Sequence, residues 1–158
     1  MSKRAKEKRL SPFRRRDVNP LGGLAIIADR QHLHKDQTTD LTLPHWLAFE
    51  NMLKHPSTLH DFETITSSIN IGIVLSEFGI RSDATDLFRR ALDASFSTQL
   101  RGTKSNVWRY NGSDIDTIRT ALTIHDEQCA ECSQGQYRKA VETVQQRFDA
   151  GNVYEEAA

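Results

Sequence analysis

The 158-residue sequence has few of the residues that mark disulfide-rich, fibrous and membrane proteins. It holds only two cysteines, which stand three positions apart and are too few and too close for a disulfide framework. Four prolines and eight glycines exclude collagen-like and proline-rich chains. The longest mainly apolar run, residues 21–28, is far shorter than the ~20 residues of a membrane-spanning helix. We therefore expect a cytoplasmic protein with free thiols and no membrane contact.

Known catalytic motifs are also missing from the sequence. It contains no phosphate-binding Walker loop, no dinucleotide-binding glycine fingerprint and no HExxH metalloprotease motif. No Ser-His-Asp or Cys-His triad can be assembled from the spacing of its residues. We therefore expect a protein that acts by binding, not an enzyme, and one that uses no cofactor.

Charge, by contrast, is plentiful and unevenly distributed. The formal net charge is zero, but residues 1–20 hold eight basic and two acidic side chains, a net charge of +6. The rest of the chain therefore carries a net charge of −6. A basic arm of this kind neutralises phosphates without choosing a base sequence, and an acidic protein surface is the alternative partner. The nucleic-acid contacts that we predict in this arm are Lys8, Arg9, Arg14, Arg15 and Arg16.

Composition divides the chain into four segments. Residues 1–20 hold few core-forming side chains and many like charges, which predicts a flexible arm. Residues 21–41 are interpreted as a linker or docking segment, because a short apolar stretch is followed by polar residues. Residues 42–150 show the periodic apolar pattern of a helical bundle, and residues 151–158 form an acidic tail.

Apolar residues recur every three or four positions, which predicts an all-α antiparallel bundle of four to five helices. The first helix is expected to begin near Leu43, with Thr42 as its cap and Pro44 in its first turn. The second is expected to be the most buried, and Gly72 within it indicates close packing by a neighbour. The expected helices span residues 43–55, 59–78, 82–96, 114–133 and 136–149.

Two connections between these helices carry further expectations. Residues 102–113 are expected to form a loop, with Trp108 and Tyr110 as its anchors. Residues 73–92 have the outline of a helix-turn-helix. The second helix of this pair would begin with Asp83 and Asp86, whose charges would repel phosphates, so an ordinary helix hairpin is the favoured interpretation.

His125, Cys129 and Cys132 form the one constellation with metal-ligand chemistry on a helix. Their spacing places them on one helix face, and imidazole and thiolates are ligands of zinc. The same face is apolar, however, and free cysteine behaves as a small buried hydrophobe. We therefore favour a core role, and zinc and a redox Cys-x-x-Cys pair are the alternatives. A second pair, His32 and His34, is interpreted as part of a polar loop.

Several short motifs resemble small helical proteins of proteobacterial phages and integrated mobile elements. The similar stretches are residues 14–21, 68–71, 75–80, 118–119 and 125–137. The functions of these proteins are generally unassigned, and some are described loosely as transcriptional regulators. The resemblance implies a cytoplasmic helical protein from a mobile element, and it supplies no catalytic residue.

These observations lead to three hypotheses. In the first, the protein is a non-enzymatic accessory protein whose arm binds nucleic acid or an acidic partner, while its body docks on a host or phage protein. In the second, it inhibits a host nucleic-acid machine as an anti-defence protein, with the acidic body blocking a basic channel. In the third, it is a small zinc protein that uses His125, Cys129 and Cys132. An amphipathic bundle also allows a homodimer.

Overall fold

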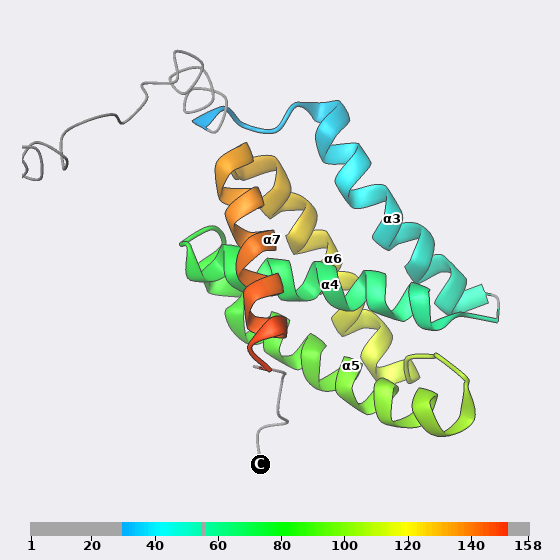
Figure 1. Ribbon diagram of the computed structural model, residues 1–158. Helices are drawn as coiled ribbons and strands as arrows, with labels where there is room; N and C mark the ends of the chain where they lie inside the picture. The colour runs from blue at the N-terminus through cyan, green and yellow to red at the C-terminus, as the bar shows by residue number, and fades with distance from the viewer. Residues whose placement is uncertain (1–29, 55, 152–158) are drawn as a thin grey trace, which may run out of the picture.

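The computed structural model describes residues 30–54 and 56–151 of the chain. The predicted arm at residues 1–20, residues 21–29 of the segment 21–41 and residues 152–158 of the acidic tail lie outside the described residues. Within the described residues the fold is all-α, and only an isolated bridge between His32 and Ser133 has β geometry. The predicted helical bundle is therefore confirmed (Figure 1). The elements are α3 (Lys35–Lys54), α4 (Leu59–Glu77), the short 3-10 helix η2 (Ser82–Ala84), α5 (Thr85–Ser105), α6 (Gly112–Glu131) and α7 (Gln134–Asp149).

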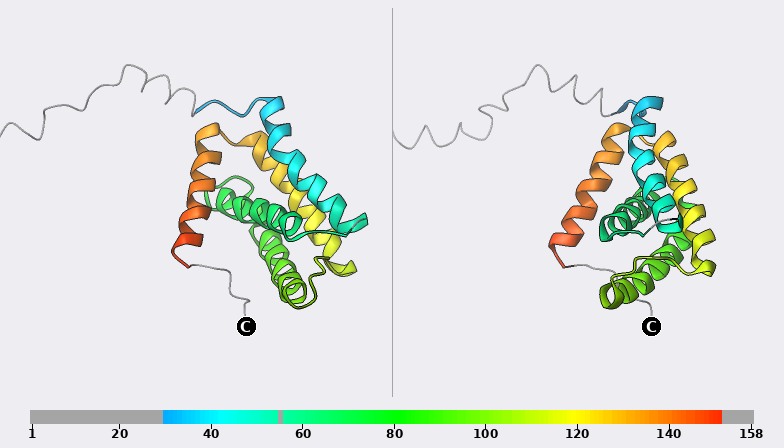
Figure 2. Two further views of the ribbon diagram at one scale, coloured as in Figure 1. Left: turned by 45° about the vertical axis from the view of Figure 1, so that its right-hand side comes forward. Right: turned by 90° about the vertical axis from the view of Figure 1, so that its right-hand side faces the viewer.

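Helix α4 lies at the centre of the bundle. It contacts α3, α5, α6 and α7, whereas α7 packs mainly on α4. Helices α3 and α6 lie side by side and run in opposite directions, and α7 stands on the other side of α4 (Figures 1 and 2). Helices α4 and α5 pack together as a helix hairpin. This agrees with the sequence, in which the acidic residues at the start of α5 favoured a hairpin over a DNA-binding helix-turn-helix.

The sequence of α4 explains why it takes this central place. Thr58 caps the helix through a capping box with Asp61. Ile65, Ile69 and Leu75 are fully buried, so the prediction of a deeply buried second helix is confirmed. After the helix ends, Gly79 adopts a φ of 90°, a left-handed conformation that suits glycine.

Gly72 is the point of closest approach between α4 and α5. A Cβ atom at this position would lie 2.5 Å from Cε1 of Phe88, which is fully buried on α5. The prediction that a neighbour packs closely against Gly72 is therefore confirmed. The absence of a side chain lets the Phe88 ring lie directly on the α4 backbone.

The expected start of α3 near Leu43 is wrong. The helix begins eight residues earlier at Lys35, so Thr42 is not its cap and Pro44 lies inside it. Proline at this position removes the hydrogen bond to the carbonyl of Asp40. Asp40 and Pro44 are both exposed, so water can satisfy that carbonyl and the helix continues.

Three other boundaries also differ from expectation. Helix α5 continues to Ser105 instead of ending near residue 96, and it includes Gly102 from the expected loop. Helix α6 begins at Gly112, two residues early. The last helix was expected to begin at residue 136, after Gly135. Helix α7 instead begins at Gln134, with Ser133 as its cap, so Gly135 lies within its first turn.

The core contains most of the apolar residues that recur at helical spacing, but Val141 and Phe148 on α7 are 41% and 70% exposed. On α3, Leu47 is 56% exposed. Leu43, one turn earlier, is also about half exposed. None of the helices in the described part of the chain has the length and apolar character needed to cross a membrane.

Candidate functional site

The predicted nucleic-acid contacts of the arm lie outside the described residues. This applies to Lys8, Arg9, Arg14, Arg15 and Arg16, so their role stays a prediction. The helical body supplies three further places where chemistry-bearing side chains meet: the His125 cluster, a hydrogen-bonded chain through His45, and a pocket beside Trp108.

The His125 cluster is part of the core. His125 is fully buried, with Nδ1 3.4 Å from the Gln128 side-chain oxygen and Nε2 3.7 Å from the Cys129 sulfur. Burial, with a contribution from the neighbouring His45, lowers the pKa of His125 from 6.5 to about 4. The imidazole is therefore neutral at pH 7.

Both cysteines of the cluster are free and buried. Burial raises the pKa of Cys129 to about 12 and that of Cys132 to about 11. At neutral pH both thiols are protonated, whereas zinc ligation and disulfide exchange use the thiolate. Among the described residues, no group of three histidine, cysteine or acidic side chains is placed to hold a metal ion.

Gln128 is a buried polar residue that the sequence reasoning missed. Its side-chain nitrogen lies within 3.0 Å of the carbonyl oxygens of Gly72 and Ile80 and of the Ser76 hydroxyl. It therefore ties α6 to α4 and to the turn that follows α4. The signal in the sequence was a glutamine within an apolar stripe, next to Cys129.

A second buried network joins α3, α4 and α6. His45 Nε2 donates to Asp126 (2.9 Å), and Trp46 Nε1 donates to the other oxygen of the same carboxylate (2.7 Å). The Ser68 hydroxyl lies 3.2 Å from His45 Nδ1 and 3.3 Å from the carbonyl oxygen of Thr64. His45 is fully buried.

The fold therefore contains a Ser-His-Asp arrangement, although none can be assembled from the spacing of residues along the sequence. Spacing could not reveal it, because Ser68, His45 and Asp126 belong to three different helices. A nucleophilic serine must meet its substrate, whereas the Ser68 side chain is buried between helices within α4. The geometry supports an interhelical connection, and the pocket described next lies elsewhere.

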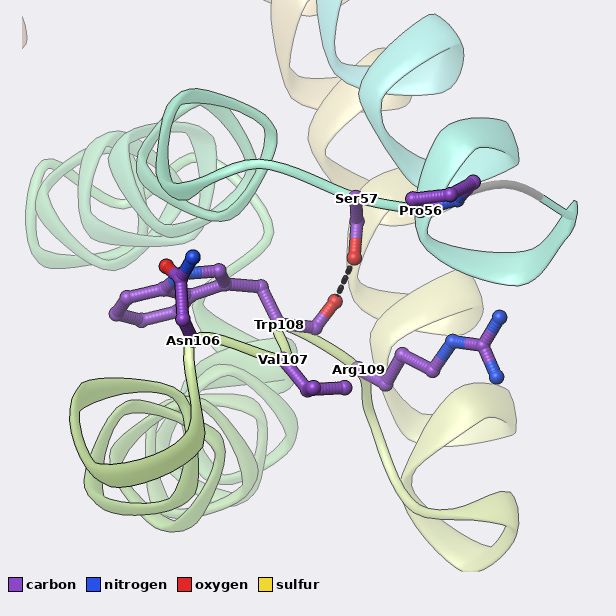
Figure 3. Close-up of a pocket in the computed structure, with 6 residues that line it drawn as sticks. All are labelled: Pro56, Ser57, Asn106, Val107, Trp108 and Arg109. Carbon is purple, nitrogen blue, oxygen red and sulfur yellow. Dashed lines mark hydrogen bonds between the residues drawn. The ribbon is translucent and has the colours of Figure 1, made fainter.

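A pocket of about 240 Å³ opens where the α3–α4 and α5–α6 connections meet. Ser57 donates a hydrogen bond to the carbonyl oxygen of Trp108 and thereby holds the two connections together (Figure 3). Asn106 and Arg109 extend on opposite sides of the Trp108 backbone (Figure 3). The lining residues are Pro56, Ser57, Asn106, Val107, Trp108 and Arg109.

Trp108 anchors this connection, as the sequence predicted. Its ring centroid lies 5.1 Å from that of Phe62, and a Cβ atom on Gly102 would lie 2.5 Å from its Cε3. The indole is 6% exposed, and its Nε1 is buried without a hydrogen-bond partner. Tyr110 is also buried, with its hydroxyl 3.3 Å from that of Ser95.

The residues around this pocket are basic. Residues 94–113 contain three basic side chains and no acidic one. Arg101 donates to the carbonyl oxygen of Arg109 (3.1 Å) and to Thr98 (3.0 Å). Within residues 30–54 and 56–151, neither of these arginines nor Lys104 forms an ion pair, whereas Arg119 and Arg147 do. We call Leu100, Arg101, Lys104, Val107 and Arg109 the cationic surface.

Comparison of the chain with protein-family models, with curated proteins and with solved structures finds no match in any of the three. The resemblance to proteins of phages and mobile elements therefore stays a prediction. Function is argued below from charge and from the geometry of the body.

Proposed function

We propose that this protein is a non-enzymatic accessory protein that acts by binding. In this proposal the basic arm contacts nucleic acid or an acidic partner, and the helical body docks on a protein. The observation that carries it is the separation of charge along the chain. Residues 1–20 carry +6, whereas the described residues hold 13 basic and 16 acidic side chains, a net charge of −3.

The physical basis for the arm is counterion release. Lysine and arginine side chains that neutralise phosphates release condensed cations, so the affinity is high at low salt and independent of base sequence. Arginine also forms bidentate hydrogen bonds with phosphate, and Arg14, Arg15 and Arg16 are consecutive. Phe13, directly before them, supplies an aromatic ring that can stack on a base.

Deletion of residues 1–16 is expected to weaken binding to a fluorescein-labelled DNA duplex at least about tenfold at low salt, because it removes all eight basic residues of the arm. Fluorescence anisotropy at several salt concentrations measures this. The slope of log affinity against log salt should become shallower. R89Q/R90Q, which removes two exposed arginines of α5, is the control and should bind as the unaltered chain does. Equal affinities with and without the arm would reject the role of the arm.

A feature of α3 supports the second hypothesis, inhibition of a host nucleic-acid machine. Asp36, Asp40 and Glu50 are exposed at helical spacing with Leu43 and Leu47, so acidic and apolar side chains share one face. Such a face suits a basic partner with an apolar contact. A host-protein complex that survives deletion of residues 1–16 would favour this alternative. The exposed leucines are also where a second copy of the chain would pack in a homodimer.

A further inference from the structure

We propose that the pocket beside Trp108 and the cationic surface bind an acidic peptide segment of a partner protein, with one apolar side chain of that segment seated in the pocket beside Val107. This deepens the proposed function and rests on it, because it assigns a docking surface to the helical body. Four observations support it: the charge of the surface, its apolar side chains, the unpartnered indole and the burial of its aromatic rings.

The charge of the surface is opposite to that of the body around it. The described residues carry −3 in total, yet residues 94–113 carry +3 without an acidic side chain. Arg109 and Lys104 are exposed. Guanidinium and ammonium groups that form no ion pair within the chain can form ion pairs with the carboxylates of a partner. Arg101 donates through Nη2 to the Arg109 carbonyl, which holds the two arginines close together.

The same part of the chain exposes two apolar side chains. Leu100 is 50% exposed and Val107 is 54% exposed. Val107 and Pro56 also line the pocket, next to the backbone of Trp108. Covering exposed apolar area stabilises a complex. The combination of cations and aliphatic groups therefore suits a segment that has both acidic and apolar side chains.

The indole of Trp108 lacks the acceptor that a peptide supplies. Trp108 lines the pocket and is more than nine-tenths buried, and its Nε1 has no hydrogen-bond partner among the described residues. A buried donor without an acceptor is unfavourable, and most such donors find one. Asn106 is exposed and lines the same pocket as Trp108, so a peptide seated there can bring a carbonyl or carboxylate oxygen to this part of the protein (Figure 3).

The same geometry disfavours nucleic acid at this surface. Single-stranded nucleic acids are held by stacking of bases on open aromatic faces. Trp108 and Tyr110 are 6% and 7% exposed, so their faces are already used within the core. The exposed apolar groups here are aliphatic and not aromatic, which favours a peptide over an oligonucleotide.

The two indole N–H signals of the full-length, ¹⁵N-labelled chain provide the test. The probe is the blocked peptide Glu-Glu-Leu-Glu-Glu, and the peptide Lys-Lys-Leu-Lys-Lys is its control. The acidic peptide is expected to shift the Trp108 indole signal and the amides of residues 100–110. The Trp46 signal should not move, because that indole already donates to Asp126. The basic peptide should shift neither signal.

The variant K104Q/R109Q should bind the acidic peptide at least about fivefold more weakly, since two exposed ion pairs are lost. R89Q/R90Q removes the same charge from the other half of α5 and should bind normally. An unmoved Trp108 signal, or equal affinity in K104Q/R109Q, would overturn the proposal. A ten-residue oligothymidine that shifts the Trp108 signal more strongly than the peptide would also overturn it, in favour of nucleic acid.

This result is separable from the test of the arm. Loss of duplex binding on deletion of residues 1–16 concerns only the arm, and K104Q/R109Q should leave duplex binding unchanged. If the arm fails its test and the peptide still binds, the docking surface stands without the nucleic-acid role. If duplex binding succeeds and the peptide fails, the docking surface is wrong and the role of the arm stands.

Discussion

Acidification from pH 7 to pH 4 is expected to lower the free energy of unfolding by about 3 kcal/mol through His125 alone. The pKa of this imidazole falls from 6.5 in the unfolded chain to about 4 in the folded one, mainly because the ring is buried and partly because His45 lies close. The ring centroids of the two histidines are 5.7 Å apart.

The direction follows from proton binding. Between pH 6.5 and pH 4 the unfolded chain binds a proton at His125 that the folded chain does not, so stability decreases as the pH falls. The contribution is fully present above pH 6.5 and is lost progressively toward pH 4. Protonation in place would put a charge beside His45 in the core, where burial of an unpaired charge is strongly unfavourable.

Urea denaturation of the chain and of its H125F variant measures this contribution. Between pH 7 and pH 4, the decrease in the free energy of unfolding should be about 3 kcal/mol smaller for H125F than for the unaltered chain. H60Q is the control at an exposed histidine of α4, and this variant should keep the steep loss of stability that depends on His125. Parallel pH profiles for H125F and the unaltered chain would show that His125 is not the group that titrates.

The free energy of unfolding of the Gly72→Ala variant is expected to be about 1–3 kcal/mol lower than that of the unaltered chain, because the new Cβ would overlap the Phe88 ring. The clash would involve Cε1 and Cζ, at 2.5 and 2.6 Å from the new atom. Intrinsic helix propensity acts in the opposite direction, since alanine is favoured over glycine by about 1 kcal/mol in a helix interior. The expected sign therefore depends on tertiary packing overriding local preference.

Gly112→Ala provides the matched control for this substitution. Gly112 is also helical, but no atom outside its local helix lies within 4 Å of the position a Cβ would take. This variant should be neutral or slightly stabilised. In the double variant G72A/F88L, the smaller side chain should relieve part of the overlap, so the two effects should not add. Equal stabilities of the Gly72 and Gly112 variants in denaturant titration would contradict the close contact.

Much of the helical pattern was predictable because its signals are local. The Thr58 cap, the apolar stripe through Ile65 and Ile69, and the stop at Gly79 each depend on residues a few positions apart. Local signals misled where the tertiary structure outweighed them. Pro44 was interpreted as the start of a helix that in fact begins at Lys35, and Gly102 as part of a loop.

The sequence by itself determined that the chain is helical, that α4 is the most buried helix, and that charge is divided between an arm and a body. These properties follow from composition and from spacing along one helix. Only the tertiary structure decided that Ser68, His45 and Asp126 meet, and that the loop between α5 and α6 places Trp108 between Phe62 and Gly102. Contacts between distant segments depend on how helices pack, and packing leaves no periodic trace in a single sequence.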